Sequence, residues 1–146
     1  MNWKAIFFDL DGTLIHTSPE IADAVNDTLH HFDLPEVTQA QVDAWIGQGT
    51  RELLILAMAH VTQQSNDAVR QSQAFADALP VFDTHYQNRC GTRSTLYPHV
   101  RDTLQTLRAC GCRLGVVTNK EGRYTQTILQ QHNLLGSFDL VISGET

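Results

Sequence analysis

The sequence is poor in basic residues, and Lys4 and Lys120 are its only lysines. Ten Lys and Arg residues stand against sixteen Asp and Glu residues, which gives a formal net charge of -6. Because binding to a nucleic-acid backbone requires clustered Lys and Arg, this balance argues against a nucleic-acid partner. No stretch approaches the roughly 20 consecutive apolar residues of a membrane-spanning helix, so we expect no membrane partner. The N-terminus has no small-residue cleavage site, so we expect no signal peptide.

Cysteine is also scarce. The three cysteines, Cys90, Cys110 and Cys112, are odd in number and follow no regular framework, which indicates thiols without disulfides in a reducing cytoplasm. Cys110 and Cys112 have the spacing of half a metal site, but no second pair of Cys or His lies at ligand spacing. With 42% hydrophobic and 18% charged residues, the 146-residue chain has the composition of one globular domain, or of a core with a smaller insert. No feature of the sequence fixes an oligomeric state.

Three short apolar runs predict buried parallel strands, because they are continuous rather than alternating. They cover residues 5–8, 114–117 and 138–142, and small or acidic polar residues follow each of them. Helical periodicity precedes the second run, with Pro98 in the first turn, and continues over residues 125–132 between the second and third runs. The order strand, helix, strand, helix, strand predicts an α/β fold with a partial doubly wound, Rossmann-like parallel sheet.

Residues 17–90 have helical periodicity and no strand signal. We predict that they form an all-helical cap inserted into an α/β core made of residues 1–16 and 91–146. The last apolar stripe of this insert, over residues 69–86, predicts a fourth helix with a bend near Pro80.

Three local signals place the helices of the insert. Ser18 precedes a proline and an acidic residue, which predicts that it is the N-cap of the first helix. Thr38 and Gln41 have the spacing of a capping box. The two glycines of segment 47–49 predict the end of the second helix.

Two carboxylates, Asp9 and Asp11, come where the first apolar run ends. In open α/β sheets, ligands bind beyond the carboxyl ends of the strands, so these acids should lie at the functional edge. Residues i and i+2 of a strand share a face, roughly 6.5 to 7 Å apart, whereas Leu10 should point into the core. Gly12 allows a sharp turn that exposes backbone N–H groups. A divalent cation, best Mg²⁺, would relieve the repulsion between the acids and attract a phosphate.

The apolar run and the Asp-x-Asp-Gly-Thr pattern of segment 7–14 resemble the first motif of the haloacid dehalogenase superfamily. Segment 116–120, Val-Val-Thr-Asn-Lys, is similar to its second motif, and the helical insert lies where that superfamily carries a cap. Segments 96–98, 114–120 and 138–144 resemble the phosphoglycolate phosphatase branch. The resemblance implies a Mg²⁺-dependent hydrolase of small phosphorylated metabolites, with phosphoglycolate as the best single candidate.

The resemblance also implies a role for each residue of the first motif. Asp9 would be the nucleophile that forms an aspartyl phosphate. Asp11 would protonate the leaving oxygen and then deprotonate the hydrolytic water. The Asp9 carboxylate and the Asp11 backbone carbonyl would bind Mg²⁺.

Further residues would bind the substrate. Gly12, Thr118, Asn119 and Lys120 would contact the phosphoryl group, and Arg51 in the cap would contact the other end of the substrate. Simpler interpretations remain open for several of them: a helix N-cap for Thr118 and Asn119, a solvated lysine for Lys120, and a plain helix connection for Arg51.

The sequence departs from the superfamily pattern in two ways. A third-motif lysine and a fourth-motif pair of acids would follow the third strand, but the sequence stops at Thr146. We therefore expect a fragment with weak Mg²⁺ affinity, little turnover, an unpaired sheet edge and a missing layer of helix. His16 stands where the branch usually has an acid. A silent anion-binding fragment and an acidic phospho-acceptor module are the alternative functions.

Overall fold

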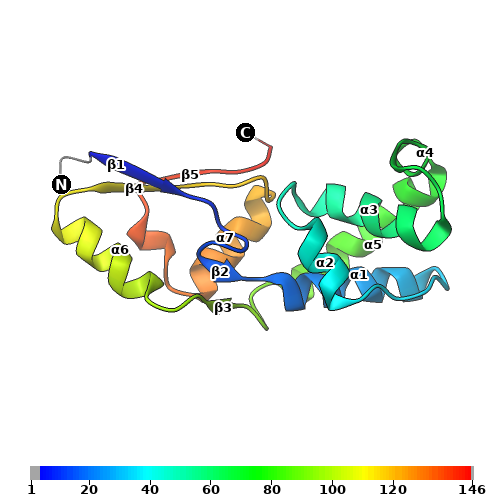
Figure 1. Ribbon diagram of the computed structural model, residues 1–146, viewed down its shortest axis with the longest axis horizontal. Helices are drawn as coiled ribbons and strands as arrows, with labels where there is room; N and C mark the ends of the chain where they lie inside the picture. Colours follow the sequence, from blue (N-terminus) through cyan, green and yellow to red (C-terminus); the bar gives the residue numbers. More distant parts are fainter. Residues whose placement is uncertain (1–3, 146) are drawn as a thin grey trace.

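The structure is a computed structural model that describes residues 4–145. Its elements, in chain order, are β1 (Ala5–Phe8), β2 (Ile15–His16), α1 (Ser18–His31), α2 (Gln39–Trp45), α3 (Thr50–Thr62), α4 (Asn66–Arg70), α5 (Gln73–Arg89), β3 (Thr95–Leu96), α6 (Val100–Ala109), β4 (Arg113–Val117), α7 (Gly122–Gln131), the 3-10 helix η1 (Leu135–Ser137) and β5 (Leu140–Ile142). Figure 1 shows two parts: the sheet with α6 and α7, and the helices α1–α5 beside it.

The three predicted strands pair in parallel, in the order β1-β4-β5. Phe8 is paired with Val116, and Val117 with Ile142, so the carboxyl ends of the strands meet at one edge, as expected. Strand β5 begins two residues later than the predicted run. The α/β fold with an inserted helical region is therefore confirmed, and α1–α5 lie within the range 17–90 that was predicted for the cap.

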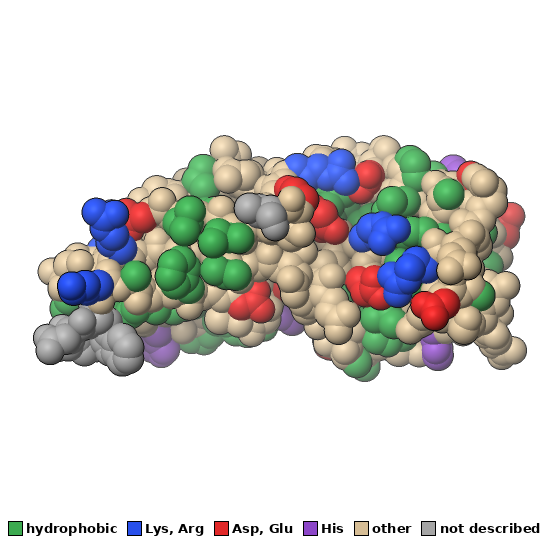
Figure 2. Space-filling model, turned by 90° about the horizontal axis from the view of Figure 1, so that it is seen from above, with side chains coloured by type: hydrophobic (Ala, Val, Ile, Leu, Met, Phe, Trp, Pro, Cys, Tyr) green, Lys and Arg blue, Asp and Glu red, His purple; other side chains and the backbone are tan. Residues whose placement is uncertain are grey.

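Within residues 4–145, helices cover only one face of the sheet. Helices α6 and α7 lie on the same side of it in Figure 1. On the sheet, Phe7, Val117 and Leu140 keep 54%, 44% and 48% of their surface exposed, and Figure 2 shows hydrophobic side chains gathered over this part of the molecule. Within residues 4–145, no strand pairs with the outer edges of β1 and β5. The predicted fragment, with a missing layer of helix and an unpaired sheet edge, stays a prediction.

A two-stranded antiparallel sheet joins the core to the helical part, and it was not predicted. Ile15 pairs with Leu96, and His16 pairs with Thr95. Figure 1 shows that β2 leads directly into α1, while β3 lies on the return from α5 to the core. Two-residue strands are too short to have a recognisable period, so only the pairing reveals them.

The helix signals of the insert were only partly correct. The capping box is confirmed, because the Gln41 N–H donates to Thr38 Oγ1 at 3.2 Å and the Thr38 N–H donates to Gln41 Oε1 at 2.8 Å. The break over segment 47–49 is confirmed as well, since α2 ends at Trp45 and α3 begins at Thr50. The Ser18 N-cap is wrong: Ser18 is the first helical residue of α1, and the N-cap is the residue before it.

The expectations for the last helix of the insert and for Pro98 differ from the structure. The expected single helix over 69–86 is two helices, because Ser72 caps a new helix, α5, and its hydroxyl oxygen accepts the Phe75 N–H. Helix α5 continues through Pro80, and the predicted bend there stays a prediction. Pro98 lies outside α6, whose N-cap is His99 with a φ of 69°.

The remaining exclusions concern cysteines and membranes. No disulfide joins the three cysteines, all of which lie in the described part of the chain. Burial raises the pKa of the Cys90 thiol to about 12. Within residues 4–145, no helix has the length and apolar character needed to cross a lipid bilayer.

Candidate active site between the sheet and the cap

The turn after β1 carries both aspartates. Strand β1 ends at Phe8, so Asp9 and Asp11 lie beyond the strand rather than within it. Leu10 is fully buried, as expected, and its carbonyl oxygen accepts hydrogen bonds from the N–H groups of residues 13–15. Gly12 has a φ of +77°, which favours glycine, but its N–H donates to the Ile15 carbonyl oxygen at 3.0 Å. Gly12 therefore permits the turn, and its own N–H is bonded within that turn.

Asp9 is an exposed carboxylate. Its Oδ1 accepts a hydrogen bond from the Leu10 N–H at 2.7 Å. No Lys, Arg or His side chain among the described residues forms an ion pair with it. An accessible carboxylate without a cationic partner keeps its lone pairs available to a metal ion or an electrophile.

Asp11 has the opposite environment. The Thr17 hydroxyl donates to Asp11 Oδ1 at 2.5 Å, and Lys120 Nζ donates to both carboxylate oxygens, at 3.2 and 3.1 Å. The Asp11 side chain is 12% exposed and that of Lys120 is completely buried. The cation that faces the Asp11 carboxylate is therefore Lys120. Only the backbone carbonyl of Asp11 is left for the Mg²⁺ role that the resemblance implies.

Lys120 bridges the core and the cap. Lys120 lies just beyond β4, and its Nζ is 4.9 Å from the centroid of the Tyr86 ring, which belongs to α5. The alternative of a solvated lysine is wrong, because the whole residue is 1% exposed. A phosphate contact by Lys120 stays a prediction. The only signal in the sequence for the contact between Lys120 and Asp11 was that Lys4 is the only other lysine.

The surroundings of Lys120 are buried and polar. Tyr86 and Glu20 are both fully buried, and neither Tyr86 Oη nor Glu20 Oε1 has a hydrogen-bond partner among the described residues. Burial raises the pKa of both side chains; for Glu20, hydrogen bonds from Ser94 and Gly91 and the charge of Lys120 oppose this rise. An ammonium group in such surroundings strengthens its interactions with nearby anions.

Thr118 and Asn119 follow β4 at the same edge. The Lys120 N–H donates to Thr118 Oγ1 at 3.1 Å, which leaves the Thr118 hydroxyl hydrogen able to donate to a ligand. Asn119 Nδ2 donates to the Gly47 carbonyl oxygen of the cap at 2.8 Å. The N-cap interpretation of these two residues is wrong, because Glu121 is the N-cap of α7.

Glu121 links the core to the cap, which the sequence analysis missed. Its Oε2 accepts the Thr50 hydroxyl at 2.7 Å, and its Oε1 accepts the Arg51 N–H at 3.3 Å. A carboxylate at the start of α3 also interacts favourably with the helix dipole. Gly49 has a φ of +91°, and a Cβ there would lie 2.8 Å from the Asn119 carbonyl oxygen, so only glycine fits this close approach.

Replacement of Glu121 by Gln is expected to loosen this contact. The variant loses the carboxylate charge at the first turn of α3, so hydrogen exchange at the Thr50 and Arg51 amides should become about fivefold faster, in line with a loss of about 1 kcal/mol. Native-state exchange followed by NMR measures this. Glu36→Gln, at a side chain that is 61% exposed, is the matched control and should leave both amides unchanged. Equal protection in the two variants would contradict the link.

Arg51 lies on the cap surface. Its guanidinium carbon is 5.1 Å from the centroid of the Phe75 ring. It also borders a depression of about 290 Å³ with Asn119, Glu121 and Glu145 among its lining residues. The position beside the core edge is compatible with a substrate contact, which stays a prediction.

The residues present fit a weak Mg²⁺ site. Asp9 offers an exposed carboxylate and Asp11 a backbone carbonyl, both hard oxygen ligands. Mg²⁺ commonly binds one or two carboxylates and completes its shell with water and substrate phosphate. Within residues 4–145, no group of three or more His, Cys, Asp or Glu residues is placed to hold a metal ion.

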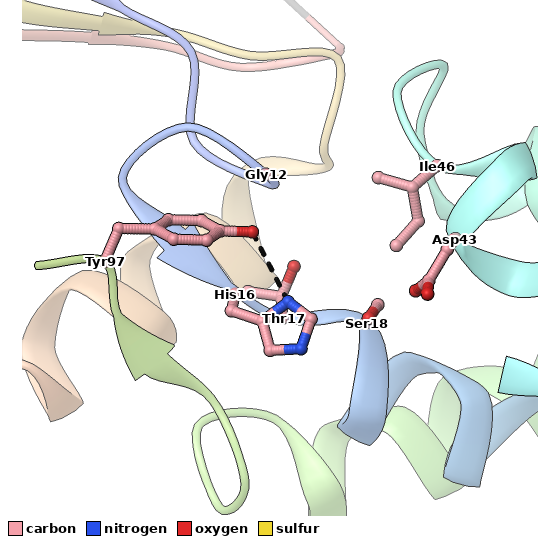
Figure 3. Close-up of a pocket in the computed structure, with 7 residues that line it drawn as sticks. All are labelled: Gly12, His16, Thr17, Ser18, Asp43, Ile46 and Tyr97. Carbon is pink, nitrogen blue, oxygen red and sulfur yellow. Dashed lines mark hydrogen bonds between the residues drawn. The ribbon is translucent and has the colours of Figure 1, made fainter. Parts of the chain in front are cut away.

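A cavity of about 230 Å³ lies beside this turn, between the core and the cap (Figure 3). The residues that line it are Gly12, His16, Thr17, Ser18, Asp43, Ile46 and Tyr97. Because Thr17 also donates to Asp11, the cavity adjoins the predicted acid–base residue.

The chain is similar to known phosphatases along almost its whole length. The phosphoglycolate phosphatase of Aliivibrio fischeri is 38% identical over 145 residues, which cover 98% of this chain and 62% of that protein. The phosphoglycolate phosphatase of Pasteurella multocida is 35% identical over 144 residues, which cover 99% of this chain and 64% of that protein. The crystal structure of a predicted phosphoglycolate phosphatase from Haemophilus somnus superposes with a TM-score of 0.86 at 30% identity, again over 99% of this chain and 64% of that one.

The chain thus spans less than two thirds of the length of these relatives. The family model of haloacid dehalogenase-like hydrolases matches residues 6–146, which include the turn after β1, the whole helical insert and the tip of β4. The chain therefore belongs to the haloacid dehalogenase-like hydrolase family.

Proposed function

We propose that the whole protein is a Mg²⁺-dependent phosphate monoester hydrolase of the phosphoglycolate phosphatase type, and that this chain contains the nucleophile half of its active site. The observation that carries the proposal is the unequal environment of the two aspartates. Asp9 is exposed and has no cationic partner among the described residues, whereas Asp11 is held by Thr17 and Lys120. A nucleophile needs access to phosphorus, while an acid–base residue needs a fixed position beside the leaving oxygen.

The proposed reaction has two steps. In the first, an Asp9 carboxylate oxygen forms a bond to phosphorus, the bond from phosphorus to the leaving oxygen breaks, and Asp11 gives that oxygen a proton. In the second, Asp11 takes a proton from water, which attacks the aspartyl phosphate and releases inorganic phosphate and Asp9. Bound Mg²⁺ would supply charge that reduces the repulsion between Asp9 and the phosphate.

The second strand tip supports the same reaction. The Thr118 hydroxyl is positioned by the Lys120 N–H, and its hydrogen would be donated to a phosphoryl oxygen, beside the Asn119 backbone. The contacts of Asn119 with Gly47 and of Glu121 with Thr50 keep the cap against this edge. A closed cap would exclude water from the first step and bring Arg51 close to the substrate.

A silent anion-binding fragment is the second candidate function. It is favoured by the engagement of Lys120 with Asp11, because no other lysine of the chain lies near Asp9 to neutralise a bound phosphate. An acidic phospho-acceptor module is a third candidate. It shares the chemistry of Asp9 but gives the helical cap no role.

The test is hydrolysis of phosphoglycolate and p-nitrophenyl phosphate with Mg²⁺, by the 146-residue chain and by a form extended past Thr146. We expect the extended form to hydrolyse both esters, and the 146-residue chain to be slower by about 10³-fold or more, because the resemblance implies further active-site residues after the third strand. An extended form that hydrolyses neither ester would refute the enzyme. A stable phosphate on Asp9 without turnover would favour the phospho-acceptor module instead.

A further inference from the structure

The cavity of Figure 3 adjoins the turn that carries Asp9 and Asp11, with Gly12 in its wall. His16 and Tyr97 line its core side, with Tyr97 Oη 3.4 Å from His16 Nδ1, whereas Asp43 and Ile46 line its cap side. The Asp11 carboxylate, which would protonate the leaving oxygen, is bound to Thr17, another residue of the cavity wall. Any group attached to that oxygen therefore has this cavity beside it.

Asp43, an exposed residue, supplies the negative charge that borders the cavity. Gln39 Nε2 donates to Asp43 Oδ1 at 3.0 Å, and the Ser18 hydroxyl hydrogen-bonds to the same carboxylate. These two hydrogen bonds hold the pKa of Asp43 below its usual value, with a smaller contribution from the charge of His16. In Figure 3 the carboxylate is turned toward Ser18, so it faces the cavity.

No permanent positive charge balances Asp43. Among residues 4–145, neither Lys nor Arg lines the cavity, and His16 is its only basic side chain. The two cations that were predicted for the site have other partners, since Lys120 binds Asp11 and Arg51 stacks on Phe75. A carboxylate in the cavity would meet the charge of Asp43 without a lysine or arginine to pair with.

The same wall suits hydroxyl groups. Asp43 accepts hydrogen bonds, and the Tyr97 and Ser18 hydroxyls and the His16 ring can each donate or accept one. Ile46 adds an apolar contact that suits the carbon atoms of a small alcohol. These donors and acceptors match an uncharged alcohol with additional hydroxyls better than they match a charged group.

We infer that this cavity selects an uncharged, hydroxyl-bearing leaving group over a carboxylate-bearing one, and that Asp43 determines this specificity by repelling a carboxylate. The inference rests on the proposed phosphate ester hydrolysis and replaces phosphoglycolate, its best single candidate substrate, by a hydroxyl-bearing ester. The preferred substrate then differs from the one in the name of the relatives, because the group esterified in phosphoglycolate carries a carboxylate.

The test compares the binding of three phosphate esters to the 146-residue chain in the presence of Mg²⁺: glycerol 2-phosphate, phosphoglycolate and 2-aminoethyl phosphate. Binding is measured by NMR. Signals of Thr118 and Asn119 report the phosphate end, and signals of His16 and Ile46 report the cavity. We expect glycerol 2-phosphate to bind about tenfold more tightly than phosphoglycolate, the effect of one pair of like charges in partly hydrated surroundings. Asp43→Asn should reduce this ratio to about twofold or less, because the amide keeps the shape of the side chain without its charge.

Asp67→Asn is the matched control, since that side chain is 89% exposed on α4, and it should leave the tenfold ratio unchanged. Phosphoglycolate binding as tightly as glycerol 2-phosphate, or a ratio that Asp43→Asn leaves unchanged, would overturn the inference. Tightest binding of the third ester, 2-aminoethyl phosphate, would also overturn it, because the cavity would then select a cation. If neither these esters nor inorganic phosphate moves the Thr118 and Asn119 signals, the proposed function fails together with the inference.

Discussion

Asp9→Asn is expected to abolish phosphate ester hydrolysis by the extended protein, with kcat lowered by at least about 10³-fold, because an amide oxygen is a poor nucleophile toward phosphorus. Folding should be unaffected. Asp9 is exposed, and the hydrogen bond that it accepts from the Leu10 N–H can equally be accepted by the amide oxygen of Asn. Initial rates with p-nitrophenyl phosphate and urea unfolding, measured on the same samples, separate the two effects.

Asp33→Asn is the control for this experiment. Asp33 is an exposed carboxylate with a φ of 56°, a backbone conformation that asparagine adopts as readily, so the variant should keep full activity. If Asp9→Asn retains more than about a tenth of the wild-type rate, Asp9 is not the nucleophile. The proposed two-step reaction would then have to be abandoned.

Lys120→Met is expected to lower the free energy of unfolding by about 3 kcal/mol, because it leaves the Asp11 carboxylate largely buried without its cation. Methionine has a similar length and no charge, so it fills most of the space that the lysine stem occupied. The loss should remain near the lower end of what broken buried ion pairs cost, since Asp11 keeps its hydrogen bond from Thr17. Urea unfolding of the 146-residue chain, followed by circular dichroism, measures it.

Two comparisons make the result specific to the ion pair. Lys4→Met carries the same change at an exposed residue and should alter the free energy of unfolding by no more than about 0.5 kcal/mol. In the double variant with Asp11→Asn and Lys120→Met, the loss should be clearly smaller than the sum of the two single losses, because both remove one shared interaction. Additive losses, or a Lys120→Met loss as small as that of Lys4→Met, would contradict the ion pair.

The order of the elements and their chemistry could be read from the residues themselves. Continuous apolar runs predicted β1, β4 and β5, and the parallel pairing that follows from them brought Asp11 and Lys120 to one edge. The capping box at Thr38 depends on residues three apart, so it too was readable from the sequence. The Ser18 N-cap failed because its neighbour Thr17 occupies the N-cap position and turns its hydroxyl toward Asp11.

The sequence by itself determined the three parallel strands, the helical character of the insert and which polar residues end the strands, because these depend on apolar periodicity and on neighbours a few residues away. Only the tertiary structure decided the direction of the side chains at the site. Lys120 binds an aspartate 109 residues earlier, and Glu121 binds a threonine 71 residues earlier. Such contacts depend on how the cap packs against the sheet, and no local pattern records that packing.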